Sequence, residues 1–230
     1  MTYKAFNNRP LTNWPVHCIL RLDKSLPREA LEPIKLEMEA ALLHLDRQFT
    51  NRHLVGHPDA LAYREHKSDE MGRLQRWYDR LLDKVQTGPM FLADPRAKQV
   101  IIDNLLHLAK LEGIEIFAIC VMSNHVHMLL RTKSSEIVVP FVPFMERHKR
   151  YTGRKIKQLK LTEAERVWAR KAFDRDVRPG RFWVVLNYIL QNPVKIGLVD
   201  RPLDFCGMWV QPGLIENSGR FFPGVTDINT

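Results

Sequence analysis

Apolar residues follow two patterns along this chain, short nearly continuous runs and longer stretches with a helical repeat. The short runs predict strands at 16–23, 114–122 and 123–131. The helical repeat and the local composition predict helices at 31–49, 69–85, 94–112, 145–160 and 181–191. The predicted order begins with a strand, a helical insertion and a helix. Two strands joined by a tight turn come next, and residues 168–177 are then expected as a strand or loop that closes the sheet.

Local signals predict where some of these helices begin and end. Ser68 is expected to be the N-cap of the helix at 69–85. Gly113 directly follows the helix predicted at 94–112, at a position where helix C-termini favour glycine. Pro193 is expected to stop the last helix, because the residue before a proline disfavours helical geometry.

Residues 51–67 lie between two predicted helices and lack an apolar repeat. His53 and His57 are four residues apart, a spacing that would ligate a metal only on a helix. Gly56 and Pro58 oppose a helix at this point. We therefore predict a surface loop without a metal site.

The run Ser123–Arg131 contains two histidines separated by one apolar residue. In a strand, alternate side chains point to opposite faces, so His125 and His127 would lie side by side while Val126 faces the core. Two neutral imidazoles on one surface can hold a divalent cation and leave most of its coordination sphere open. The alternative for such a short motif is a pair of half-exposed histidines with no ligand.

The helix predicted at 181–191 ends with a polar pair on its flank. Tyr188 and Asn192 are four residues apart, so a hydroxyl and an amide can reach the same ion or ligand from one helix edge. The alternative for Tyr188 is a packed ring with its hydroxyl in water.

The charge is strongly positive, with 35 Lys and Arg against 26 Asp and Glu, a formal net charge of +9. Between Met145 and Arg181 there are 13 basic and 5 acidic residues, which gives that segment a surplus of +8. A local basic surface attracts phosphate backbones, and an aromatic residue among cations, here Tyr151, can stack on a base. A solvated helix face is the alternative.

A length of 230 residues allows one large domain or a domain with an insertion. We expect one domain at 1–205 with a helical insertion at about 25–88, and a C-terminal tail at 206–230. The three cysteines are widely spaced and are expected to be reduced. The N-terminal residues lack the apolar segment of a signal peptide, so a cytoplasmic, nucleoid-associated protein is expected.

Four motifs together resemble the single-tyrosine HUH-endonuclease transposases, and most of all the REP-associated tyrosine transposases. They are VMSNHVHMLL at 121–130, KRYTGRKI at 149–156, WARKAFDRDVR at 168–178 and YILQNPVKIGLV at 188–199. The resemblance covers roughly residues 100–199. Ser123 stands where the family often has proline, and Ala169 stands where it often has glutamine.

The resemblance implies an α+β fold with a ferredoxin-like antiparallel sheet, helices on one face, and the histidine pair on a central strand. Residues 25–88 would then be an inserted helical hairpin. It also implies DNA strand cleavage and rejoining on single-stranded or hairpin DNA, through a covalent 5′-phosphotyrosine at Tyr188. A divalent ion, Mg²⁺ or Mn²⁺, would be held by His125, His127 and Asn192.

The expected DNA contacts combine the basic segment with the third motif. They are Arg147, Lys149, Arg150, Tyr151, Arg154, Lys155, Lys157, Trp168 and Arg178.

Two other functions remain open from the sequence. The chain could be a non-catalytic binder of structured DNA derived from a transposase, or a metal-dependent phosphodiesterase in which water attacks. The sequence also leaves open whether the protein is a monomer or a homodimer, and whether Tyr188 acts with the histidines of its own chain.

Overall fold

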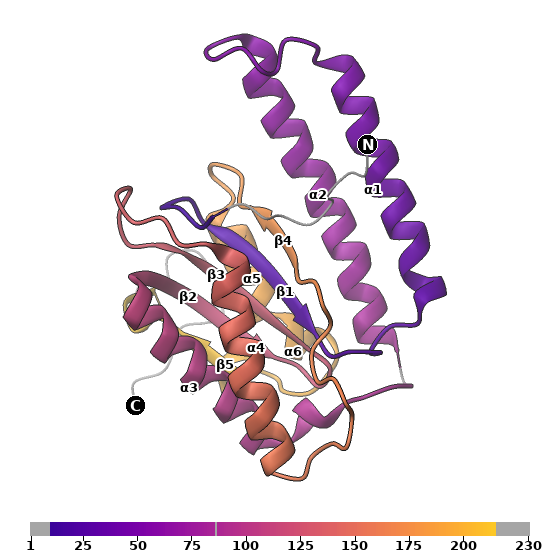
Figure 1. The fold of residues 1–230 in the computed structure, drawn as a ribbon, viewed down its shortest axis with the longest axis vertical. Helices are drawn as coiled ribbons and strands as arrows, with labels where there is room; N and C mark the ends of the chain where they lie inside the picture. The colour runs from indigo at the N-terminus through magenta and orange to yellow at the C-terminus, as the bar shows by residue number, and fades with distance from the viewer. Residues whose placement is uncertain (1–9, 86, 215–230) are drawn as a thin grey trace.

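The computed structural model describes residues 10–85 and 87–214, and its centre is a five-stranded antiparallel sheet (Figure 1). The strand order across the sheet is β4-β1-β3-β2-β5. The strands are β1 (Val16–Arg21), β2 (Ile114–Val121), β3 (His125–Thr132), β4 (Phe173–Asp176) and β5 (Met208–Val210). The α-helices are α1 (Arg28–Gln48), α2 (Pro58–Lys84), α3 (Pro95–Glu112), α4 (Phe141–Gln158), α5 (Phe182–Leu190) and α6 (Asn192–Lys195). Short 3-10 turns lie at Phe91–Ala93 and Pro202–Asp204.

The core has the ferredoxin-like arrangement that was predicted. Leaving out the inserted hairpin, the order along the chain is β1, α3, β2, β3, α4, β4, and β3 lies between β1 and β2 in the sheet. The antiparallel α+β fold class is therefore confirmed.

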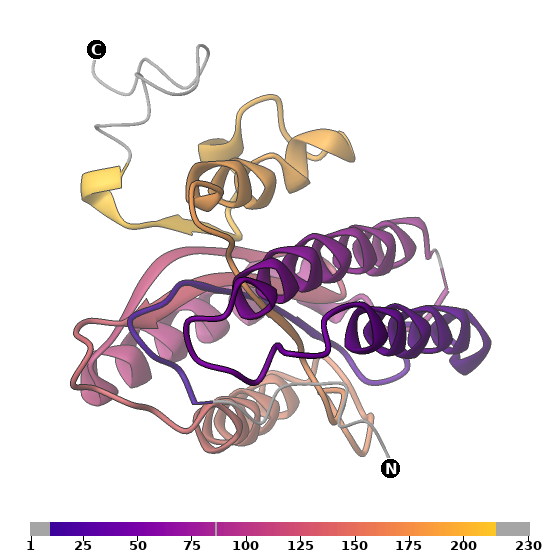
Figure 2. The ribbon, with the colours of Figure 1, turned by 90° about the horizontal axis from the view of Figure 1, so that it is seen from above.

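One face of the sheet packs against α3 and α4. Val126, Met128 and Leu130 of β3 join Phe144 and Ile156 of α4 in the largest apolar cluster. Figure 2 shows α4 and α5 on opposite sides of the sheet.

The position of α3 follows directly from its sequence signals. Asp94 is its N-cap and accepts a hydrogen bond from the backbone N–H of Arg96, and Pro95 occupies the first helical position. Gly113 ends the helix with φ of 67°, a left-handed conformation that favours glycine. A Cβ at Gly113 would also lie 2.8 Å from Cδ1 of Ile137, so a larger residue would require the Ile137 side chain to shift.

Helices cover both faces of the sheet, whereas helices were expected on one face only. Val185, Leu186 and Ile189 of α5 pack on Cys120 of β2 and Leu129 of β3. The inserted hairpin α1–α2 packs beside α5 against β1 and β4 (Figure 1).

The inserted hairpin is longer than predicted, because α2 begins at Pro58 rather than at Asp69. The predicted surface loop at 51–67 is therefore wrong for its second half, and Ser68 lies inside the helix. Pro58 was expected to oppose a helix, but it occupies the first helical turn. Backbone N–H groups in the first turn have no acceptor within the helix, so the missing N–H of proline costs no hydrogen bond there. His57 is the N-cap, and its side chain accepts from the backbone N–H of Asp59.

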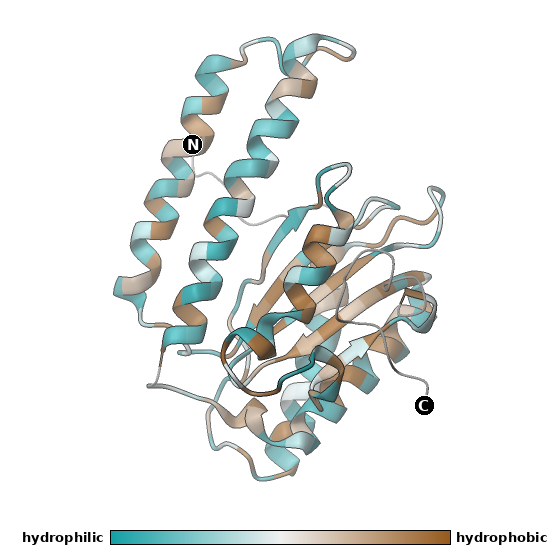
Figure 3. Cartoon of the chain, turned by 180° about the vertical axis from the view of Figure 1, so that it is seen from behind, coloured by the Kyte–Doolittle hydropathy of each residue, from teal (hydrophilic) through white to brown (hydrophobic). Residues whose placement is uncertain are grey.

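Part of the expected C-terminal tail belongs to the sheet, because β5 pairs with β2 at its edge. Residues 215–230 of that tail lie outside the described residues. Figure 3 shows the central strands as mostly hydrophobic, whereas much of the inserted hairpin is hydrophilic. Within residues 10–85 and 87–214, no helix combines the length and the apolar character needed to cross a membrane.

Candidate active site

The two motif histidines lie side by side on the face of the sheet that α5 and α2 cover. His125 is 1% exposed and His127 is fully buried, while Val126 points into the opposite cluster. Their Nε2 atoms are 3.0 Å apart. The structure thus gives the alternation predicted from the sequence, and it excludes the alternative of two half-exposed histidines.

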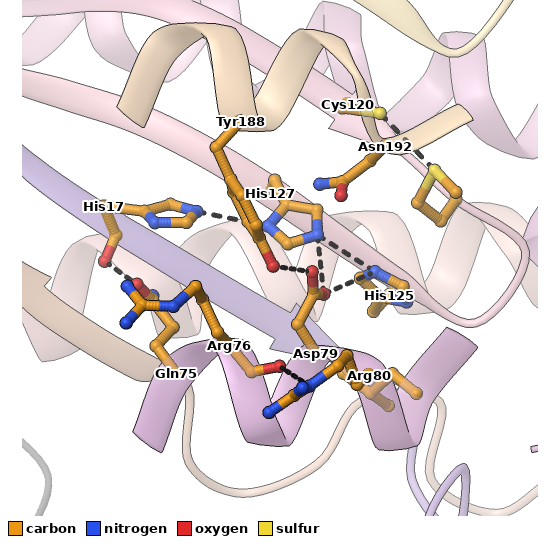
Figure 4. Close-up of polar contacts among 12 residues, drawn as sticks. His17, Gln75, Arg76, Asp79, Arg80, Cys120, His125, His127, Tyr188 and Asn192 are labelled. Carbon is orange, nitrogen blue, oxygen red and sulfur yellow. Dashed lines mark hydrogen bonds and ion pairs between the residues drawn. The ribbon is translucent and has the colours of Figure 1, made fainter. Parts of the chain in front are cut away.

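A carboxylate from the inserted hairpin completes this pair. Asp79 of α2 is 1% exposed, and its Oδ1 lies 2.9 Å from Nε2 of His127 and 3.3 Å from Nε2 of His125 (Figure 4). Asp79 could not be identified from the sequence, because in the helical repeat of 69–85 it is one polar position among many. Its role depends on how α2 packs on the sheet.

These three side chains have the chemistry and spacing of a divalent-cation site. An octahedral ion with ligands at 2.0 to 2.1 Å would place neighbouring ligand atoms about 3.0 Å apart. The three observed separations are 2.9, 3.0 and 3.3 Å. Oδ1 of Asp79 is buried and makes no hydrogen bond within the described part of the chain, so a bound cation would satisfy it.

A neighbouring amide sets the tautomer of His125 in the form that binds metal. Nδ2 of Asn124 donates to the carbonyl oxygen of Leu82 at 3.0 Å, which leaves Oδ1 of Asn124 as an acceptor 2.6 Å from Nδ1 of His125. The ring must therefore carry its proton on Nδ1. Nε2 is then the ring atom that faces Asp79 and His127, and a cation would bind its lone pair, as in metal-bound histidines held by an outer hydrogen bond.

A third buried histidine supports His127 from β1. Nε2 of His17 lies 3.1 Å from Nδ1 of His127, and the two rings are stacked. Burial, followed by the charges of His127 and Arg175, holds the pKa of His17 well below its ordinary value. His17 is therefore neutral at pH 7. From the sequence, His17 was expected only as a residue of the strand at 16–23.

Tyr188 points from α5 toward this cluster, and its hydroxyl donates a hydrogen bond to Oδ2 of Asp79. Burial, and then the charge of Asp79, raise the pKa of Tyr188 above its ordinary value. Burial alone would raise the pKa of Asp79, but His127 and His125 together bring it well below its ordinary value. In this arrangement Tyr188 holds its proton and Asp79 is ionised.

A lysine covers the tyrosine from the short helix that follows. Nζ of Lys195 lies 3.8 Å from the centre of the Tyr188 ring and 3.4 Å from Oδ1 of Asn192. Asn192 is buried, and its Nδ2 finds no partner among residues 10–85 and 87–214. It lies on the same side of the sheet as the histidines (Figure 4), but the side chain that contacts both histidines is Asp79. Asn192 as third metal ligand stays a prediction.

The basic helix predicted to bind DNA is α4, on the face of the sheet opposite Tyr188. Tyr151 is 41% exposed there, among the basic side chains. A pocket of about 500 Å³ lies between α4 and residues 165–170, and its basic lining residues are Lys149, Arg150, Arg154, Lys157, Arg166 and Arg170. Arg147 and Lys149 also pair with Glu112 and Glu146 respectively.

Two of the predicted DNA contacts have different surroundings. Trp168 borders the same pocket but is only 4% exposed, and its indole N–H donates to Oγ1 of Thr152 at 2.9 Å, so its ring belongs to the core. Little of the Trp168 ring is therefore accessible to DNA. Arg178 lies on the side of the inserted hairpin, where it pairs with Asp69 of α2.

Comparison with known proteins gives a family match to part of this chain. A family model described as IS200-like transposases matches residues 91–191, which include His125, His127 and Tyr188 but neither Asp79 nor Asn192. A search of curated proteins finds no match. Among solved structures, the chain is similar to a REP-associated tyrosine transposase bound to a REP hairpin. That likeness has 13% identity and a TM-score of 0.48, and it covers 97% of this chain and 94% of the other. The family match agrees with the resemblance to transposases over residues 91–191, which hold three of the four motifs and the start of the fourth.

Proposed function

We propose, on the premise that residues 91–191 are related to IS200-like transposases, that this chain cleaves and rejoins DNA strands through Tyr188. The observation that carries the proposal is the convergence of the Tyr188 hydroxyl and both motif histidines on one buried carboxylate, Asp79. The substrate is single-stranded or hairpin DNA. The product of cleavage is a protein joined to DNA by a 5′-phosphotyrosine.

Asp79, His125 and His127 would hold the divalent ion, Mg²⁺ or Mn²⁺. The fit rests on their spacing, on the unsatisfied Oδ1 of Asp79 and on the tautomer that Asn124 imposes. When bound, such an ion neutralises charge on a phosphodiester and favours the ionised form of a nearby hydroxyl. This is the contribution that Tyr188 needs, since its surroundings raise its pKa.

The residues of the chain have distinct tasks in the proposed reaction. Asp79 orients the Tyr188 oxygen by accepting its hydrogen bond. That oxygen forms the new bond to phosphorus, the bond from phosphorus to the 3′-oxygen breaks, and the 3′-oxygen takes up a proton. Lys195, over the tyrosine ring, adds positive charge beside the reacting phosphate. The reverse reaction consumes the phosphotyrosine and needs no ATP, because the phosphodiester energy is kept.

The basic surface of α4 is proposed to hold DNA away from the reacting phosphate. It lies across the sheet from Tyr188, so it suits the stem of a hairpin whose single-stranded end passes around the sheet. Its cations contact phosphates, and Tyr151 can stack on an unpaired base.

The test is a protein–DNA adduct that survives boiling in denaturant. The full chain, a labelled hairpin with a single-stranded flank, and Mn²⁺ should give an adduct that Tyr188→Phe abolishes and EDTA prevents. Tyr63→Phe is the matched control, because it also removes one hydroxyl, here from a hydrogen bond to Asp46. An adduct undiminished in Tyr188→Phe would refute the assignment.

Two other results would select the alternatives. Cleavage that survives Tyr188→Phe but is lost in His125→Ala would mean that water attacks. Binding without cleavage of any hairpin, unaffected by EDTA, would mean a non-catalytic binder.

A further inference from the structure

Two arginines from different elements meet beside Tyr188. A Cβ placed on Gly72 of α2 would lie 3.5 Å from Nη1 of Arg76 and 3.6 Å from Cζ of Arg175 in β4. Both guanidinium groups therefore lie over the same point of α2. Neither group was singled out by the sequence, since they are about a hundred positions apart.

Neither arginine forms an ion pair with a carboxylate among residues 10–85 and 87–214. The charge of Asp69 acts on Arg175, but the Asp69 carboxylate pairs with Arg178. Nε of Arg175 donates instead to a neutral amide oxygen, Oε1 of Gln75. Burial, and then the adjacent Arg76, lower the pKa of Arg175 to about 10. Two like charges held together without a carboxylate form a site that favours an anion.

The pair is directly connected to the proposed active site. Arg76 precedes Asp79 by three positions on α2, so the two side chains lie on the same face of the helix. Figure 4 shows Arg76 and Gln75 on the side of Tyr188 that faces α2. Gln75 also donates to the carbonyl oxygen of His17 at 3.4 Å, and the His17 ring lies 6.1 Å from the Tyr188 ring.

A groove leads from this pair to the surface. It lies between α2 and β4, has a volume of about 640 Å³, and Arg175 is among its lining residues. Arg52, Arg64, Lys67 and Arg178 also line it, so with Arg175 its arginine and lysine residues outnumber its three acidic residues, Glu65, Asp174 and Asp176. An exposed aromatic residue, Trp14, lies at its wall. Cations with an interleaved aromatic suit a single strand, which needs phosphate contacts and a stacking surface.

We propose that Arg76 and Arg175 together bind a backbone phosphate of the DNA strand next to the one attacked by Tyr188, and that the strand continues into the groove between α2 and β4. The planar guanidinium fork matches two phosphate oxygens, and two such forks can hold one phosphate from both sides. The inference rests on the proposed function for the position of the reacting phosphate. It gives the inserted hairpin a second task, because α2 then supplies Asp79 to the ion and Arg76 to the substrate.

The experiment measures binding of a fluorescein-labelled single-stranded 20-mer to the full chain between 50 and 200 mM salt. Arg76→Gln should weaken binding about fivefold or more at low salt, and should reduce the salt slope by about 0.7, the value for one phosphate contact on a single strand. Arg175→Lys keeps the charge but loses the fork, so it should weaken binding with little change in slope. Thermal melting of each variant establishes that it is folded.

Arg73→Gln is the matched control on the same helix. The substitution also removes one guanidinium group. Because Arg73 pairs with Glu37 and Glu70, DNA binding should stay at the wild-type level. Wild-type affinity and slope in folded Arg76→Gln and Arg175→Lys would overturn the proposal. An equal loss in Arg73→Gln would overturn it too, because the effect would then be one of overall charge.

The proposal and the proposed function fail in different ways. If Tyr188→Phe abolishes the adduct while both arginine variants bind normally, the phosphate site is wrong and the function stands. If the wild type forms no adduct but Arg76→Gln loses binding as described, the phosphate site stands and the function is wrong.

Discussion

Asp79 is the side chain on which the assignment of the metal site depends. It contacts both histidines and Tyr188, whereas Asn192, the third ligand predicted from the resemblance, has its amide oxygen toward Lys195. A carboxylate is also the harder ligand and suits Mg²⁺ or Mn²⁺.

We therefore predict that Asp79→Asn weakens Mn²⁺ binding about tenfold or more, by analogy with the loss of supporting groups in other metal sites. Electron paramagnetic resonance of free Mn²⁺ measures this without DNA and without activity. Asp103→Asn, on α3 across the sheet, should bind Mn²⁺ as the wild type does, because Asp103 accepts a hydrogen bond from Gln99 and lies away from the histidines. If Asn192→Ala loses the ion and Asp79→Asn keeps it, the ligand set predicted from the resemblance is right.

Trp168 gives a second prediction about a single side chain. Its burial and its hydrogen bond to Thr152 indicate a structural role, so Trp168→Phe should lower the free energy of unfolding by about 1 to 2 kcal/mol in urea denaturation. DNA affinity should not change.

Tyr151→Ala, by contrast, should weaken DNA binding by about 1 to 3 kcal/mol with little effect on stability, since it removes an exposed stacking surface. The reverse pattern would restore Trp168 as a DNA contact.

Among the helices, α3 and α4 are joined by a buried polar contact that should respond to pH. Nδ1 of His148 in α4 lies 2.8 Å from Oδ1 of Asn104 in α3. Burial, and then the charge of Lys149, lower the pKa of His148 to about 3. The unfolded chain gains a proton at this position near pH 6.5 and the folded chain does not.

The stability that comes from a neutral His148 is therefore complete above pH 6.5 and is lost as the pH falls toward 3. At pH 5 the loss should be about 2 kcal/mol, at about 1.36 kcal/mol for each pH unit. Urea denaturation at pH 7 and pH 5 measures it, and His148→Gln should lose about that much less than the wild type. The exposed residue His107 gives the control, because His107→Gln should keep the wild-type difference. Equal losses in all three proteins would contradict the prediction.

The helices also show which elements could be predicted from the sequence. The bounds of α3 were predicted because Asp94 and Gly113 are strong local signals at its two ends. The start of α2 was missed because Pro58 can either break a helix or occupy its first turn, and only the packing of the hairpin decides between them.

Across the whole molecule, the family match covers β2, β3, β4 and the helices α3, α4 and α5, but neither β1 and β5 nor the hairpin that supplies Asp79. The sequence predicted the face shared by His125 and His127, because strand alternation is local, and it predicted Tyr188 through the motifs. It could not predict Asp79 or the pair of Arg76 and Arg175, because these contacts join segments that only the tertiary fold brings together. Nor could it predict that α4 lies across the sheet from Tyr188.

The most direct test of the account is mass spectrometry of the protein–DNA adduct after digestion with nuclease and trypsin. Cleavage after Arg181 and Lys195 releases residues 182–195, in which Tyr188 is the sole hydroxyl-bearing side chain. If Tyr188 is the nucleophile, this peptide carries a nucleotide phosphate that forms with Mn²⁺ and is absent after EDTA. A nucleotide on any other peptide, or cleaved DNA without an adduct, would contradict this assignment.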